Sequence, residues 1–194
     1  ADKSLSVTAD TLGGGGSLLS KGDLTLALQQ DFTNDSQITA NGRAVISTTG
    51  LLTNRSILQA SDLEVRGGNV DNTVTGHISG GKTLVATSGT VINRGLIDGG
   101  LTRVEAATLD NVGTGRIYGD HLAIKAGTVQ NREENGRAAV IAARERLDIG
   151  ANVINNREQA LLFSAGSLNI GGNLAGNYQA IGQAELVFND SATL

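Results

Sequence analysis

The sequence predicts an all-β fold, a parallel β-helix solenoid of about eight coils with roughly 20 residues in each coil. The first observation is a series of asparagines separated by steps of 20, 18, 21, 18, 20 and 24 residues. The series comprises Asn34, Asn54, Asn72, Asn93, Asn111, Asn131 and Asn155. A second, aliphatic series recurs with it at Ile38, Ile57, Ile78, Ile97, Ile117, Ile141, Leu162 and Ile181. Two series that drift together indicate an internal repeat, and repeat periods of about 20–50 residues are typical of solenoids and other arrays.

Short segments that alternate apolar and polar residues predict the strands of each coil. This period of two is typical of a half-buried strand, and no stretch keeps helical spacing over two or more turns. The segments are 24–26, 63–65, 122–124, 147–149 and 168–170. A unit of about 20 residues with two or three such strands closes one coil of a parallel β-helix.

Glycines precede several of these strands and predict tight turns. Examples are Gly22, the pair Gly80-Gly81, the pair Gly99-Gly100, and Gly119. Glycine adopts positive φ angles without steric cost, so we expect these positions to supply the positive φ angles of the turns.

The recurring asparagines predict a ladder of stacked side chains. Equivalent residues of successive coils lie about 4.8 Å apart, so each amide can donate to the next amide and accept from the previous one. Such pairing satisfies polar groups that would be costly to bury. The alternative is that asparagine serves only as a turn residue that tolerates left-handed conformations.

The composition supports this fold. Aromatic residues are 3% of the chain, as expected if stacked aliphatic side chains fill a narrow interior. The chain has no proline, so every residue keeps a backbone N–H for the ladders. About eight coils would form a rod roughly 40 Å long. We expect residues 1–194 to form one structural unit without a linker.

Charge and cysteine content limit the classes of function. The net charge of −4 argues against nucleic acid as a partner, because nucleic acid requires a basic face. No cysteine is present, which excludes disulfides and thiolate metal ligands. No apolar run is long enough to predict a membrane span. The chain opens within sequence that is already repeat-like, so we expect it to be part of a longer protein.

One recurring pattern resembles a known family. The pattern is Leu-x-Leu, then Leu/Val-x-Asn, then Ile-x-Ala/Gly-Gly, and it extends over about residues 20–190. It is similar to the filamentous haemagglutinin repeats of large bacterial exoproteins that are secreted by the two-partner (type Vb) route. Effectors of contact-dependent growth inhibition belong to the same group. The stretches Arg137–Gly150 and Leu161–Gly171 resemble the more specific part of such regions.

The resemblance implies an extracellular β-helical filament that carries adhesive or toxic segments. Its implied partners are the rest of its own exoprotein and, during secretion, an outer-membrane transporter. The Asn-Pro motifs of the family's secretion domain cannot occur here, because the chain has no proline. The segment is therefore similar to the shaft and not to the secretion domain, and we expect a monomer that is secreted or held at the bacterial surface.

The sequence contains no pattern typical of an enzyme. β-Helical carbohydrate enzymes need paired carboxylates on one face, whereas Asp62 and Asp120 occupy similar positions about three coils apart. The two histidines, His77 and His121, lack metal-ligand spacing and are interpreted as surface residues. We therefore expect no catalytic residues, no metal site and no cofactor.

A charged insertion marks a candidate contact loop. The asparagine spacing lengthens to 24 residues after Asn131, and the added residues include Arg132, Glu133, Glu134 and Arg137. Insertions in solenoids form loops on one face, often the binding face. The alternative is a solvated turn, which we favour because the charges have mixed sign and no aromatic residue accompanies them. The charged turn at Arg157-Glu158 could stack near this loop.

Two functions are consistent with these features. The first is a structural shaft segment that extends functional regions from the cell. The second is direct binding of a target-cell receptor or glycan, which would require an exposed aromatic residue or a groove across several coils. Tyr118 and Tyr178 are the only tyrosines and lie about three coils apart.

Overall fold

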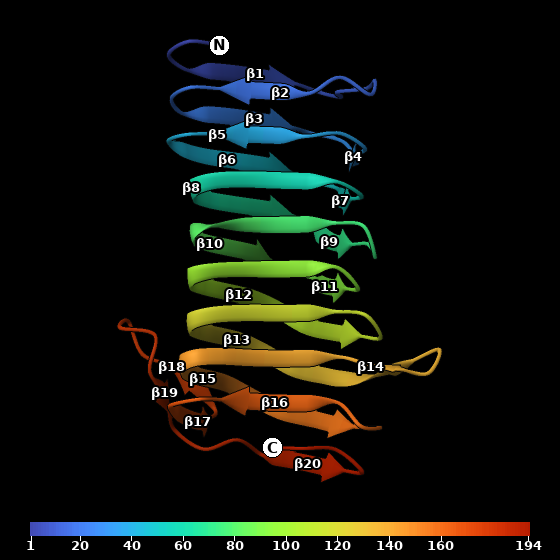
Figure 1. Cartoon of the computed structure of the whole chain (residues 1–194), viewed down its shortest axis with the longest axis vertical. Helices are drawn as coiled ribbons and strands as arrows, with labels where there is room; N and C mark the ends of the chain where they lie inside the picture. The colour runs from blue at the N-terminus through green and yellow to red at the C-terminus, as the bar shows by residue number, and fades with distance from the viewer.

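The chain winds into a rod of stacked coils with the two termini at opposite ends (Figure 1). The computed structural model describes all 194 residues and consists of strands, turns and loops without any helix. Eighteen of the strands join into one continuous sheet through pairings that are parallel between successive coils. The predicted parallel β-helix is confirmed. None of its segments forms a helix able to cross a membrane.

Each regular coil has three strand segments, and these stack into three faces that we call A, B and C. Face A contains β1 (Leu5–Ala9), β3 (Leu24–Leu28), β6 (Arg43–Thr48) and β17 (Ser167–Gly171). Face B contains β4 (Phe32–Asn34), β7 (Leu51–Asn54), β9 (Asn69–Asn72), β11 (Thr90–Asn93) and β20 (Leu186–Asp190). Face C contains β2 (Leu18–Ser20), β5 (Ile38–Ala40) and β16 (Leu161–Ser164).

Longer strands bend around the corners and contribute to more than one face. Strands β8 (Ile57–Gly67) and β10 (His77–Thr87) serve faces C and A. Strands β12 (Leu96–Val112), β13 (Arg116–Glu134) and β15 (Val140–Arg157) serve all three. The remaining strands, β14 (Arg137–Ala138), β18 (Asn173–Leu174) and β19 (Ala180–Ile181), form antiparallel pairs outside the regular coils.

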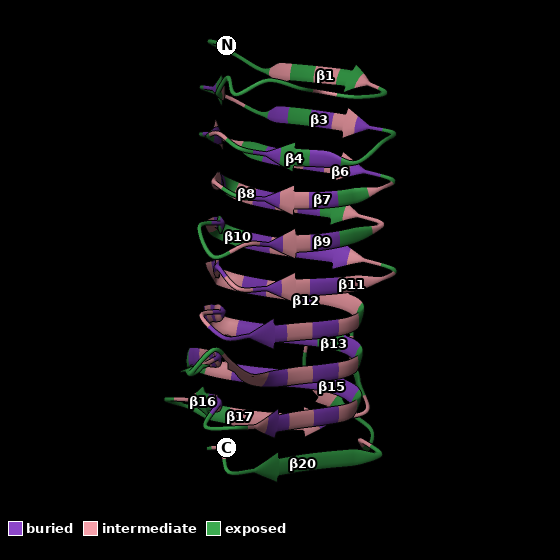
Figure 2. Ribbon diagram, turned by 90° about the vertical axis from the view of Figure 1, so that its right-hand side faces the viewer, coloured by how far each residue is buried: buried purple, intermediate pink, exposed green.

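The interior is a column of stacked aliphatic side chains. Thirty-two buried residues form one continuous hydrophobic cluster. Buried and exposed residues alternate along the strands, as Figure 2 shows, because successive side chains of a strand point to opposite sides. All of the alternating segments predicted from the sequence, such as 24–26 and 63–65, lie on face A.

The aliphatic series follows the predicted repeat with two corrections. Ile38 pairs with Leu58, which in turn pairs with Ile78, so Leu58 is the buried member and Ile57 is not. Ile181 is also wrong, because it lies in the antiparallel pair of β18 and β19 and is 47% exposed. The series ends with Leu162 on β16.

The expectation of positive φ angles at the recurring glycines is wrong. Positive φ occurs only at four other glycines, namely Gly14, Gly113, Gly136 and Gly182. The backbone stays extended where the strands bend between faces C and A. Glycine is needed at this corner because the backbone of the preceding coil lies too close for a Cβ atom. A Cβ atom on Gly80 would lie 2.6 Å from the carbonyl oxygen of Ala60 in the preceding coil.

Two of the three buried threonines, Thr83 and Thr102, give a test of the packing of the interior. Thr83 donates its hydroxyl to the carbonyl of Asp98 at 2.8 Å, whereas the buried Oγ1 of Thr102 has no hydrogen-bond partner. An unpartnered buried hydroxyl costs about 1–3 kcal/mol. We expect Thr102→Val to raise the free energy of unfolding by about 1 kcal/mol and Thr83→Val to lower it by about 1 kcal/mol. Urea denaturation of the two variants would measure this, and equal signs would contradict it.

Candidate functional site

The asparagine ladder runs along face B with one hydrogen bond per coil. Each Nδ2 donates to the Oδ1 of the next asparagine at 2.8 Å through Asn34, Asn54, Asn72, Asn93, Asn111 and Asn131. These side chains are buried, and five of the six are fully inaccessible. The amides are therefore paired side chains of the interior and not merely turn residues.

The seventh predicted member of the ladder is wrong by one residue. Asn131 donates to Asn156 at 2.8 Å, and Asn156 donates to Asn189 at 2.7 Å. Asn155 instead pairs in register with Gln130 and is half-buried on the outer side of the strand. Because side chains alternate along a strand, a shift of one residue exchanges the inner for the outer side.

The charged insertion forms a β-hairpin that projects from the corner after face B, at the right of Figure 1. Strands β13 and β14 pair antiparallel through Glu134 and Arg137. The turn is Asn135-Gly136 with φ angles of 55° and 74°, and two positive φ angles are typical of a type I′ hairpin turn. The sequence analysis did not predict this hairpin, although the Asn-Gly pair is a sequence signal that could have indicated it.

Two of the four predicted contact residues are held against the rod. The guanidinium of Arg132 donates two hydrogen bonds to the carboxylate of Asp110. The guanidinium of Arg94 likewise donates two hydrogen bonds to the carboxylate of Glu134, at 2.7 and 2.8 Å. The hydrogen bond from Arg94 lowers the pKa of Glu134. Glu133 accepts the N–H of Gly136 within the hairpin. Only Arg137 lies exposed near the tip.

The Arg94–Glu134 pair gives a test of how firmly the hairpin is attached. Both side chains are about one-third exposed, so solvent screens the attraction. We expect Glu134→Gln to lower the free energy of unfolding by about 0.5–1 kcal/mol at low salt and by less at high salt. Arg137→Ala is the control and should leave it unchanged. Denaturation at two salt concentrations would measure this, and a salt-independent loss would argue against the ion pair.

A second departure from the regular coils is a flap, residues 172–185, which connects β17 on face A to β20 on face B. It contains the antiparallel pair of β18 and β19 and lies beside the rod at the left of Figure 1. Glycine permits its close contact with face A, because a Cβ atom on Gly150 would lie 2.3 Å from the backbone of Asn173. No sequence pattern indicated the flap.

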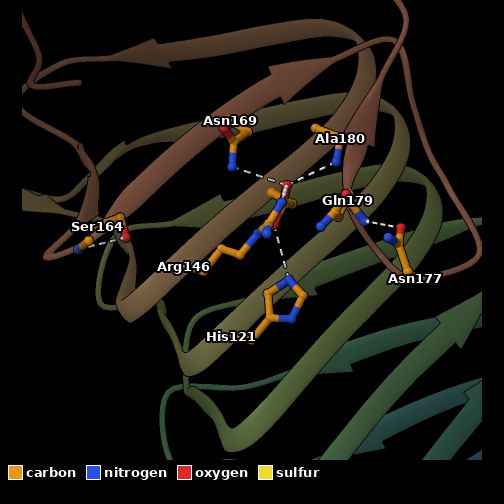
Figure 3. Close-up of polar contacts among 9 residues, drawn as sticks. His121, Arg146, Ser164, Asn169, Asn177, Gln179 and Ala180 are labelled. Atoms are coloured by element: carbon orange, nitrogen blue, oxygen red, sulfur yellow. Dashed lines mark hydrogen bonds and ion pairs between the residues drawn. The ribbon is translucent and has the colours of Figure 1, made fainter.

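The flap is anchored on the buried carboxylate of Asp148, on β15 of face A. Figure 3 shows four of its partners, His121, Arg146, Asn169 and Ala180, with their hydrogen bonds converging on this carboxylate. Its oxygens accept the backbone N–H of Ala180 in the flap at 2.9 Å and the guanidinium of Arg146 at 3.0 Å. They also accept the amide of Asn169 at 3.3 Å, and His121 Nε2 lies 3.1 Å away. Burial alone raises the pKa of Asp148, but these hydrogen bonds, led by that of Arg146, outweigh it and lower the pKa.

The interpretation of His121 as a surface residue is therefore only partly right. Its ring is 27% exposed and contacts Asp148, whereas His77 is exposed as expected. No group of three or more His, Cys, Asp or Glu side chains is placed to hold a metal ion. The hydrogen bonds of Asp148 join the flap to face A of three successive coils, through His121 on β13, Arg146 on β15 and Asn169 on β17.

The flap also places Tyr178 over face A. The guanidinium of Arg103 lies 4.2 Å from the centre of the Tyr178 ring and donates to its hydroxyl at 3.2 Å. Tyr178 has a φ angle of 65°, which is uncommon for a bulky residue and costs free energy that the surrounding contacts must supply. Residues with such strained backbone cluster at functional sites.

A groove runs along the outer side of face A and ends at this tyrosine. Its volume is about 510 Å³. Its lining comprises Arg43, Asp62, Glu64, Lys82, Thr83, Leu84, Leu101, Arg103 and Tyr178. These residues come from β6, β8, β10, β12 and the flap, so the groove crosses four coils.

The Haemagglutinin repeat family matches the chain at residues 1–56 and 47–113. The two overlapping matches together span residues 1–113, which is more than half of the 194 residues. The chain belongs to the haemagglutinin repeat family. No curated protein and no solved structure matches it.

The haemagglutinin repeat is a structural and adhesive kind of repeat found in secreted and surface exoproteins. The matched residues cover the regular coils from β1 to the end of β12. The hairpin, the Asp148 anchor and the flap all lie beyond residue 113, where insertions lengthen the coils. The stretches Arg137–Gly150 and Leu161–Gly171, which the sequence indicated as the more specific part, also lie beyond the match.

Proposed function

We propose that this haemagglutinin repeat segment is a section of the shaft of a secreted bacterial exoprotein. Its task is to hold adhesive or toxic regions, such as those of contact-dependent inhibition effectors, at a distance from the producing cell. The observation that carries the proposal is the unbroken stack of coils with one buried asparagine pair per coil. Such a stack has nearest-neighbour contacts only and can be extended without limit.

The proposed partners follow from this role. They are the rest of the same exoprotein, which continues the stack, and an outer-membrane transporter during secretion. We propose a monomeric rod without catalytic activity or cofactor, and an extracellular location.

Deletion of one complete coil tests the shaft role. Residues 77–95 are suitable, because His77 and Leu96 are register partners in successive coils. Removing them in the parent exoprotein should bring Asn72 onto Asn111, keep the fold and secretion, and shorten the reach by about 4.8 Å. Deleting several coils in this way should reduce contact-dependent activity progressively. Unchanged activity after loss of most coils would contradict a role in reach.

A second proposed function is direct contact of the segment with a target-cell receptor or glycan. The groove across four coils on face A favours it, since it combines an aromatic ring with an extended surface. Binding of the purified segment to intact bacterial and epithelial cells tests this function. Saturable binding supports it, whereas no binding by a folded sample leaves the shaft role alone.

A further inference from the structure

The groove on face A combines apolar, charged and aromatic side chains. Two half-buried apolar side chains, Leu84 and Leu101, lie on adjacent coils within it. Most of the other lining residues are charged, and Tyr178 of the flap adds an aromatic ring. A surface with apolar patches between hydrogen-bonding groups suits a saccharide, whose rings present C–H faces and whose edges carry hydroxyls.

The charges at the groove nearly balance. Register pairing places Arg43, Asp62 and Lys82 in one row along the rod, followed by Leu101. Glu64 in the next row is held by Arg43 at 2.6 Å and also by Arg66. Three cations and two anions line the groove, so the excess of one positive charge suits a ligand that is neutral or carries a single acid group.

An extended peptide finds no partner for its backbone in this groove. The floor is the middle of the parallel sheet, where β8, β10 and β12 already pair with the coils on both sides. Peptides that bind sheets do so by adding a strand at a free edge. A ligand of this groove must therefore bind to side chains of the protein, which is how saccharides are bound.

The aromatic ring is preorganised. Arg103 covers one face of Tyr178 and hydrogen-bonds its hydroxyl, and the anchor at Asp148 fixes the flap that carries it. The ring therefore loses little freedom when a ligand stacks on it, which favours affinity. The positive φ angle of Tyr178 shows that the flap holds this residue in a strained conformation.

We propose that the face A groove binds a short oligosaccharide that is neutral or carries a single acid group, with one sugar ring stacked on the face of Tyr178 that Arg103 does not cover. Asp62 and Lys82 hydrogen-bond the hydroxyls of the saccharide, and Leu84 and Leu101 contact its C–H faces. This inference rests on the second proposed function, direct contact with a target cell, and it assigns that contact to a site.

A glycan array followed by titration calorimetry of the strongest ligand tests the site. The array should contain neutral, singly acidic and polysulfated oligosaccharides. We expect binding of the first or second kind, and we expect Tyr178→Ala to weaken it at least about fivefold, since such aromatic contacts contribute roughly 1 kcal/mol. Phe163→Ala is the matched control. Phe163 is 48% exposed beside Tyr118 in a separate apolar pocket formed by strands of face C and the corner that follows β16.

A second variant tests the role of the flap from a distance. Gly150→Val leaves the groove residues unchanged but places side-chain atoms where the backbone of Asn173 lies. We expect faster hydrogen exchange in residues 172–185, unchanged exchange in β8 and β10, and a similar loss of affinity.

Three outcomes would contradict the proposal that the groove binds a saccharide. They are no saccharide binding, binding of polysulfated chains alone, and binding that Phe163→Ala reduces while Tyr178→Ala does not. Cell binding that survives Tyr178→Ala and deglycosylation of the cells would keep the second proposed function but assign it to a protein receptor elsewhere. Absence of cell binding in the unaltered segment would reject the second function as well.

Discussion

Replacing Asn93 by leucine is expected to lower the free energy of unfolding by about 2–6 kcal/mol. Asn93 is fully buried, accepts from Asn72 and donates to Asn111, both at 2.8 Å. Leucine removes the donor of Asn111 Oδ1 and the Oδ1 acceptor of Asn72. Each buried group left without its partner costs about 1–3 kcal/mol. Urea denaturation would measure the total, and hydrogen exchange would place the opening at β9 to β12.

The matched control is Asn155→Leu. This asparagine has the same side chain on the same face, but it is half-buried and lies on the outer side of the rod. We expect a change within about 0.5 kcal/mol. Equal losses for the two variants would show that the ladder contributes no more than any other asparagine.

Replacing Asp148 by alanine is expected to release the flap and to cost about 3 kcal/mol. Asp148 is the acceptor for Ala180, Asn169 and Arg146, and it is inaccessible to solvent. Hydrogen exchange at residues 172–185 should rise strongly, while the ladder of face B stays protected. Asp120→Ala is the control, because Asp120 is half-exposed and pairs with Arg144 at the surface; it should cost about 0–1 kcal/mol. An unchanged flap in Asp148→Ala would show that the other contacts suffice.

The same anchor predicts how attachment of the flap depends on pH. The pKa of Asp148 lies below its ordinary value of 3.8 in the folded protein. The stabilisation by the carboxylate is therefore complete above pH 3.8 and is lost as the pH falls through the lowered pKa. We expect the flap to remain attached at pH 5 and to detach only in stronger acid. Hydrogen exchange of residues 172–185 or the fluorescence of Tyr178 would measure this as a function of pH, and detachment near neutral pH would contradict it.

The repeat itself could be predicted because each coil imposes the same chemistry on equivalent positions. Asparagines that must pair between coils and aliphatic residues that must fill the interior recur with the coil length, as Asn54, Asn72 and Asn93 do. The choice between adjacent similar residues could not be predicted. Ile57 and Leu58 are both aliphatic, and Asn155 and Asn156 are both preceded two residues earlier by an aliphatic side chain, Val153 or Ile154. Only the strand register decides which of each pair points inward.

The candidate site could not be predicted, because it arises where distant segments meet. Asp148 is separated from His121 by 27 residues and from Ala180 by 32, and the three carry no local motif. Tyr178 was identified as one of only two tyrosines, but its contact with Arg103 spans 75 residues. The flap that brings them together replaces part of a coil, and its length gives no indication of the direction in which it folds.

The amides of the ladder all point the same way. Every Nδ2 donates toward the C-terminal end, and its second hydrogen reaches a backbone carbonyl, such as those of His77, Leu96 and Val140. Reversing one amide would bring two donors together on one side and two acceptors on the other, besides losing the carbonyl. The ladder is thus a chain of hydrogen bonds with a donor group at its C-terminal end and an acceptor group at its N-terminal end. The amide of each coil must therefore adopt the orientation of the amide in the coil before it, so the side-chain hydrogen bonds run in one direction along the whole ladder.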